Sequence, residues 1–175
     1  KKYNIQIVPI VIQVGEKSYL DQIEIKPKDF IQILKTSNEK LSTSQPSPAL
    51  FTETYNKIAS KYESIISLHI SEKLSGTIQG ARMGCKDMEY SNKIYIVDSK
   101  TSSVALGLLV AEAAQLIQEG FRFEEIINRL KIAADNVKIF ISIPTLKYLM
   151  RSGRLSKTKG LLGCLLYTSP SPRDS

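Results

Sequence analysis

Three short segments of the chain are rich in hydroxyl side chains, and each ends where a helix is expected to begin. They are residues 43–48 (TSQPSP), 74–77 (LSGT) and 98–103 (DSKTSS). Ser and Thr donate hydrogen bonds, and a helix N-terminus presents unpaired N–H groups at the positive end of the helix dipole. Such turns suit an anion, but Ser, Thr and Asp are also the preferred N-caps of any helix. These residues alone leave both interpretations open.

A nucleophilic site is an alternative interpretation of the same region. Ser75, His69 and Asp98 supply the three residue types of a hydrolase triad. The G-x-S-x-G turn that exposes such a serine is absent, because the local sequence is KLSGT at residues 73–77. A serine-type hydrolase acting on an acyl ester is therefore kept as the alternative function.

Composition argues against several other classes. The chain has 175 residues, of which 42% are hydrophobic and 23% charged, as in ordinary globular proteins. It contains one histidine, His69, and two cysteines, Cys85 and Cys164, which form neither a metal-ligand pattern nor a disulfide framework. Neither glycine motif for nucleotide phosphates occurs, so no metal and no cofactor are predicted. No signal segment or membrane-spanning run is recognisable, and a cytoplasmic location is expected.

The net charge of +7 raises the question of an anionic partner. Most lysines are scattered, and no nucleic-acid recognition motif is present, so we predict no nucleic-acid partner. Arg151, Arg154, Lys157 and Lys159 do cluster. They suit transient contact with an anionic membrane surface or an acidic patch on a partner, although a solvated turn would have the same composition.

Strands alternate with helices along most of the chain. This order predicts an α/β fold with a mainly parallel sheet flanked by helices. Residues 36–47 are expected to form a loop. The predicted strands cover residues 5–14, 18–20, 64–70, 93–97 and 137–143, and the predicted helices cover residues 27–35, 48–61, from 77, 104–119 and 124–134.

The predicted helix at residues 104–119 is apolar around most of its circumference. Such a helix is expected to be buried on nearly all sides. It could form a central core helix or one wall of an apolar ligand tunnel.

Residues 164–174 (CLLYTSPSPRD) depart abruptly from the preceding pattern. The string matches one translated frame of a common transposase sequencing adapter. We therefore expect residues 164–175 to be a non-native tail.

Five motifs in a fixed order resemble the DegV family, whose characterised members bind fatty acids. These are TSQPSP at 43–48, SLHIS at 67–71 with LSGT at 74–77, VDSK at 97–100, TLKYL at 145–149 and SGRLS at 152–156. The resemblance implies that residues 1–150 form the family's N-terminal α/β lobe without its first strand. It further implies that residues 151–163 begin the connection to a second α/β lobe, which is largely missing here.

The resemblance also implies a function. A DegV protein is a lipid-binding protein and not an enzyme: it holds one long-chain fatty acid and presents its carboxylate to a separate bacterial fatty-acid kinase. The kinase makes an acyl phosphate for phospholipid synthesis. By motif match, the carboxylate would be bound by Thr43, Ser75 and Gly76. Further residues expected to line the site are Ser44, His69, Thr77, Asp98 and Ser99.

Overall fold

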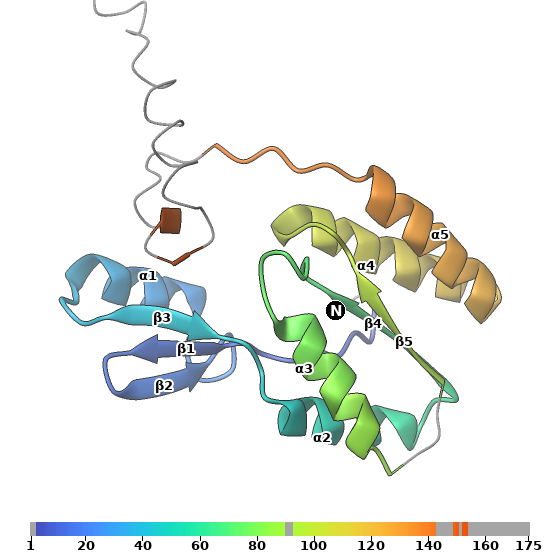
Figure 1. Cartoon of the computed structure of the whole chain (residues 1–175), viewed down its shortest axis with the longest axis horizontal. Coiled ribbons are helices and arrows are strands. Elements are labelled where there is room, and N and C mark those ends of the chain that lie inside the picture. Colours follow the sequence, from blue (N-terminus) through green and yellow to red (C-terminus); the bar gives the residue numbers. More distant parts are fainter. Residues whose placement is uncertain (1–2, 90–92, 143–148, 151, 154–175) are drawn as a thin grey trace, which may run out of the picture. The chain divides into compact units, whose positions relative to one another are not determined.

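The computed structural model describes residues 3–89, 93–142, 149–150 and 152–153, in two units that span residues 1–139 and 140–175. The first unit contains all the elements named below (Figure 1). The basic cluster predicted at Arg151, Arg154, Lys157 and Lys159 lies outside the described residues, as does the expected tail.

The N-terminal part of the first unit is a three-stranded antiparallel sheet in the order β2-β1-β3. Its strands are β1 (Val11–Val14), β2 (Lys17–Leu20) and β3 (Leu41–Ser44), and helix α1 (Pro27–Thr36) follows β2. The β1–β2 turn uses Gly15 at a φ of 59°, a conformation that glycine adopts without strain. Ile12, Val14 and Ile25 form the small core of this sheet.

Two predictions in this region were wrong. The strand expected over residues 5–14 begins only at Val11, because Pro9 has no N–H to donate to a strand ladder. The loop expected over residues 36–47 contains β3, which pairs with the second edge of β1 so that Thr43 lies opposite Ile12. Leu41 packs onto the sheet core, so burial of that side chain favours the strand.

The rest of the first unit alternates helices with two parallel strands, which confirms the predicted α/β class with helices flanking a parallel sheet. Strands β4 (Ser64–His69) and β5 (Lys93–Asp98) pair in register from Ser64 opposite Lys93 to His69 opposite Asp98. The helices are α2 (Pro48–Ala59), α3 (Thr77–Gly84), the short 3-10 helix η1 (Cys85–Asp87), α4 (Ser103–Gln118) and α5 (Phe123–Asn136).

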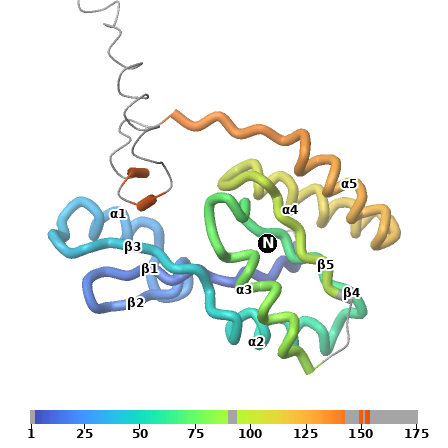
Figure 2. The backbone as a smooth tube through the Cα atoms, in the orientation of Figure 1, coloured from blue at the N-terminus to red at the C-terminus, as the bar shows by residue number. Residues whose placement is uncertain are grey.

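Helices cover both faces of the β4–β5 pair, as Figure 1 and the backbone tube of Figure 2 show. Ile66 and Leu68 of β4 pack with the buried side chains of α4 and α5. Ile94 and Ile96 of β5 pack with Phe51 and the other buried residues of α2 and α3. The apolar core therefore lies in two layers, one on each face.

The last predicted strand is absent, since residues 137–142 form no strand; Ile143 lies outside the described residues. Val137 closes helix α5 as its C-cap. Phe140 beyond it is 94% exposed. An apolar, β-prone segment becomes a strand only where a neighbouring strand can pair with it, and the described residues supply none.

Helix α4 is buried on one face only, contrary to the prediction. Ala105, Leu109, Ala113 and Leu116 are buried, whereas Val104 and Leu108 are 73% and 63% exposed. The reason is that β4 and α5 contact this helix from one side within the described part of the chain. None of the described helices combines the length and apolarity needed to cross a membrane.

Helices α2 and α3 approach so closely that Gly84 has no room for a side chain. A Cβ atom there would lie 2.6 Å from Phe51 Cβ and 2.8 Å from the Pro48 carbonyl oxygen. We expect Gly84→Ala to lower the free energy of unfolding by about 1–3 kcal/mol through overpacking. Urea unfolding followed by circular dichroism measures this change.

The matched control is Gly107→Ala in α4, where an added Cβ meets nothing within 4 Å. Here only helix propensity changes, so stability should rise by roughly 0.5–1 kcal/mol. Equal changes in unfolding free energy for Gly84→Ala and Gly107→Ala would contradict close helix packing at Gly84.

Candidate functional site

Strands β4 and β5 end together, which places the loops that follow them at one edge of the parallel pair. His69 and Asp98 are register partners, and the Ser99 N–H donates to the His69 carbonyl at 3.1 Å. The Ser71 N–H donates to the Thr101 carbonyl at 2.9 Å. Ligands of open parallel sheets bind at this carboxyl edge. The loops that carry two of the three hydroxyl-rich segments are thus brought together.

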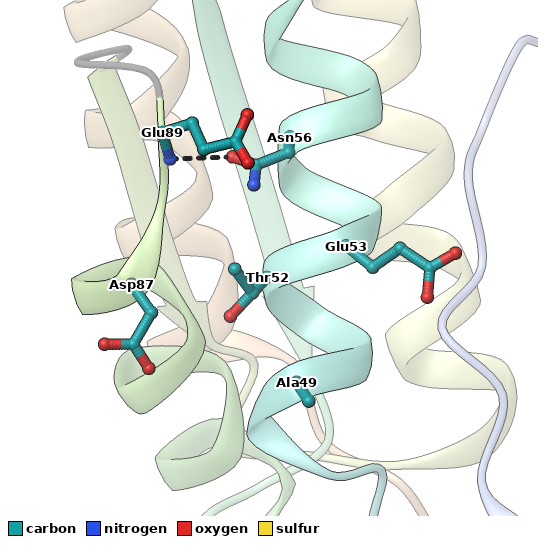
Figure 3. A pocket seen from close by; sticks show the side chains of 6 residues that line it. All are labelled: Ala49, Thr52, Glu53, Asn56, Asp87 and Glu89. Carbon is teal, nitrogen blue, oxygen red and sulfur yellow. Dashed lines mark hydrogen bonds between the residues drawn. The ribbon is translucent and has the colours of Figure 1, made fainter.

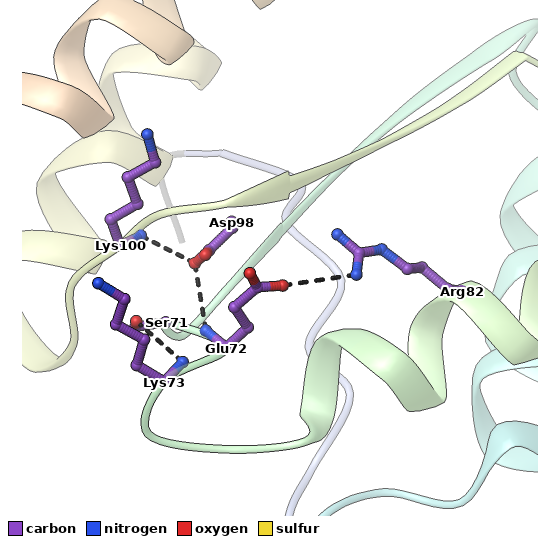
Figure 4. Close-up of polar contacts among 6 residues, drawn as sticks. All are labelled: Ser71, Glu72, Lys73, Arg82, Asp98 and Lys100. Atoms are coloured by element: carbon purple, nitrogen blue, oxygen red, sulfur yellow. Dashed lines mark hydrogen bonds and ion pairs between the residues drawn. The ribbon is translucent and has the colours of Figure 1, made fainter.

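Asp98 ties these two loops to each other (Figure 4). Its carboxylate accepts hydrogen bonds from the backbone N–H groups of Glu72 at 3.3 Å and Lys100 at 2.9 Å. Ser99 is fully buried, and its hydroxyl donates to the Thr101 carbonyl at 3.2 Å. Both side chains therefore stabilise the loop backbones.

Ser75 stands at the start of helix α3, next to Thr77. The two side-chain oxygens are 2.7 Å apart, and the Thr77 N–H also donates to the Ser75 hydroxyl oxygen at 3.3 Å. Thr77 is buried, whereas Ser75 is half-buried. When Thr77 donates both bonds, the Ser75 proton is free to be donated to an anion beside the helix N-terminus.

The third hydroxyl-rich segment reaches the same region through Gln45. The Gln45 side chain lies against Gly76, and the Pro46 carbonyl oxygen lies 3.1 Å from where a Gly80 Cβ would stand. Thr43 and Ser44 are exposed at the end of β3. Segment 43–47 therefore lies beside the turn that carries Ser75 and Gly76.

One residue of this segment acts as an ordinary helix cap. The Ser47 hydroxyl accepts the Leu50 N–H of helix α2 at 3.2 Å. Capping thus accounts for Ser47, whereas Thr43 and Ser44 make no cap.

His69 is buried and takes part in a hydrogen-bond chain that sequence reasoning missed. Its Nε2 lies 2.8 Å from Ser67 Oγ, which lies 2.8 Å from the Tyr55 hydroxyl. Phe51 packs edge-on against the imidazole, with ring centroids 5.6 Å apart. Burial, assisted by the positive charge of Arg82, lowers the pKa of His69 to about 4. The ring is therefore neutral at physiological pH.

The structure does not assemble the triad of the alternative function. His69 Nε2 bonds to Ser67, the Ser75 hydroxyl pairs with Thr77, and Asp98 accepts from backbone N–H groups. A nucleophilic serine needs a base within hydrogen-bond reach. The only histidine of the sequence, His69, bonds to Ser67 and not to Ser75. The period-two spacing of Ser67 and His69 was the one sequence signal for their shared face.

A surface hollow lies between α2 and the segment that contains η1 (Figure 3). It is lined by Ala49, Thr52, Glu53, Asn56, Asp87 and Glu89. Its three carboxylates repel an anionic ligand, so it is no candidate for a carboxylate. No cluster of potential metal ligands occurs among the described residues.

Comparison with known proteins shows the family of this chain. The model of the DegV family, described as an uncharacterised protein family, matches residues 1–170. A DegV domain-containing protein of Staphylococcus aureus is 34% identical over 167 residues, which cover 95% of this chain and 59% of that protein. The chain thus spans about three fifths of this relative's length.

Two solved structures share the fold. A DegV family protein of Thermus thermophilus, described by its fatty-acid binding, superposes with a TM-score of 0.80 at 32% identity, covering 91% of this chain and 56% of that one. DegV of Bacillus subtilis, described as a fatty-acid-binding protein, gives 0.81 at 30% identity, covering 89% and 55%.

Proposed function

Because this chain belongs to the DegV family, we propose that it binds one long-chain fatty acid at the carboxyl edge of the β4–β5 pair. Thr43 and Ser75 donate hydrogen bonds to the carboxylate, and Gly76 lets the backbone approach it. The observation that carries the proposal is the contact of Gln45 with Gly76, which brings the Thr43 segment beside the Ser75 turn. A carboxylate among apolar groups needs such donors, because burying it unpaired is costly.

The other residues of the proposed site support these donors. Thr77 orients the Ser75 hydroxyl, Asp98 and Ser99 fix the loops, and Ser44 extends the exposed hydroxyl edge next to Thr43. The exposed apolar side chains of Val104 and Leu108, near the start of α4, supply apolar surface for the acyl chain.

The protein supplies binding and orientation, and a separate cytoplasmic fatty-acid kinase supplies the chemistry. On this proposal the bound carboxylate is presented to the kinase, which forms an acyl phosphate for phospholipid synthesis. The basic residues at 151–159 provide transient contact with the membrane surface or the kinase. That no triad is assembled around Ser75 supports a binding role over catalysis.

Ser75→Ala tests the proposal in the protein expressed from its intact gene. A charge-assisted hydrogen bond contributes about 1.5–3 kcal/mol, so its loss should weaken fatty-acid affinity roughly ten- to hundredfold. Mass spectrometry of an organic extract measures the co-purifying lipid, and titration of the delipidated protein measures the affinity. Ser60→Ala, on an exposed serine that follows α2, is the matched control and should bind like the wild type.

Folded wild-type protein that carries no fatty acid and takes up none when offered would overturn the proposal. Unchanged affinity in Ser75→Ala would place the carboxylate elsewhere. Ester turnover that depends on Ser75 and His69 would instead support the hydrolase.

A further inference from the structure

Three side chains from two elements, two of them buried and Ser67 half-buried, form a hydrogen-bond chain, here called the Tyr55–Ser67–His69 relay. Tyr55 belongs to α2, whereas Ser67 and His69 point from one face of β4. Both links measure 2.8 Å between heavy atoms, and Tyr55 and His69 are only 2% and 7% exposed. The hydrogen bonds join the helix that follows the Thr43 segment to the strand that precedes the Ser75 turn.

The protons of the relay have a preferred direction. Burial raises the pKa of Tyr55 to about 12, so its hydroxyl keeps its proton, and Ser67 is the acceptor the structure offers it. Ser67 can then donate its own proton to His69 Nε2. This order pairs both hydroxyl protons and leaves neutral His69 with its proton on Nδ1.

The relay fixes how α2 packs against β4. Phe51, one turn before Tyr55, contacts the His69 ring and lies against Gly80 of α3. A shift of α2 would carry Pro46 and Gln45 with it, because the helix begins at Pro48. Gln45 is the residue that contacts Gly76, next to Ser75.

Building on the proposed function, we propose that the Tyr55–Ser67–His69 relay is a positioning device for the carboxylate site. It holds His69 as the Nδ1–H tautomer and sets the separation of the Thr43 segment from the Ser75 turn. None of the three residues needs to touch the fatty acid for this role.

Tyr55→Phe tests the relay, because it removes one hydroxyl and keeps the ring. In the protein from its intact gene, long-range ¹H–¹⁵N correlation spectra at neutral pH report the His69 tautomer, assigned by the signals lost in His69→Gln. We expect a single Nδ1–H tautomer in the wild type and a mixture in Tyr55→Phe. Fatty-acid affinity should fall roughly three- to tenfold in the same variant.

Ser67→Ala breaks both links and should act in the same direction. Tyr95→Phe, in β5 and outside the relay, is the matched control and should change neither the tautomer nor the affinity. An unchanged affinity despite a changed tautomer would overturn the positioning role, as would a weakened affinity with an unchanged tautomer. A wild type that shows the Nδ1–H tautomer but binds no fatty acid would instead identify the proposed function as the part that fails.

Discussion

Phe51→Ala is expected to cost about 3–5 kcal/mol of unfolding free energy. The ring is completely buried, and it packs on Tyr55 with centroids 5.8 Å apart as well as on His69. Gly80 and Gly84 of α3 also lie against the Phe51 side chain. Helices α2 and α3 cannot fill the space left by the ring completely, because α2 is held by its contacts with β4 and α3 by its contacts with β5. Urea unfolding of the protein from its intact gene measures the loss.

The matched control for this truncation is Leu34→Ala in helix α1. Leu34 is 53% exposed, so removing its side chain should change stability by no more than about 0.5 kcal/mol. A loss of unfolding free energy below roughly 1 kcal/mol for Phe51→Ala would contradict the tight packing of this ring between α2, α3 and β4.

Acidification should destabilise the protein through His69. The folded-state pKa is lowered to about 4 from an ordinary value of 6.5, by burial first and by Arg82 second, with Asp98 acting in the opposite direction. Below pH 6.5 His69 binds a proton in the unfolded chain but stays neutral in the folded chain until the pH nears 4, so protonation favours unfolding. The contribution is fully present above pH 6.5 and is lost as the pH falls toward 4. The shift corresponds to about 3 kcal/mol.

His69→Gln isolates this contribution, because glutamine does not titrate and can still accept the Ser67 hydrogen bond. Between pH 7 and pH 4 the unfolding free energy of the wild type should fall by about 3 kcal/mol relative to that of the variant. Carboxylates that titrate in the same range act on both proteins and cancel in the difference. Parallel pH profiles would show that His69 titrates normally.

Local signals predicted most of the helices and the parallel strands. Pro27 and Pro48 sit at the first positions of α1 and α2, where the missing N–H costs nothing. The apolar runs at Ser64–His69 and Lys93–Asp98 form β4 and β5, close to their expected limits. Family membership also followed from ordered short motifs, since the turns they encode are local.

Sequence patterns failed where a partner distant in the chain decides the outcome. Leu41–Ser44 is a strand because β1 offers a second edge, and residues 137–142 are not, since they meet no strand among the described residues. The apolar pattern of α4 could not show that its neighbours cover one side only.

For the candidate site, too, the sequence predicted the local features and the tertiary structure decided the contacts between distant residues. The sequence by itself determined which residues can donate to an anion, Ser75 and Thr43 among them, because hydroxyl chemistry and turn position are properties of the residues. Only the tertiary structure decided that His69 bonds to Ser67 and not to Ser75, and that Gln45 meets Gly76. Whether two side chains form a hydrogen bond depends on differences of a few tenths of an ångström in the distance between their atoms. The packing of the helices on the strands sets those distances.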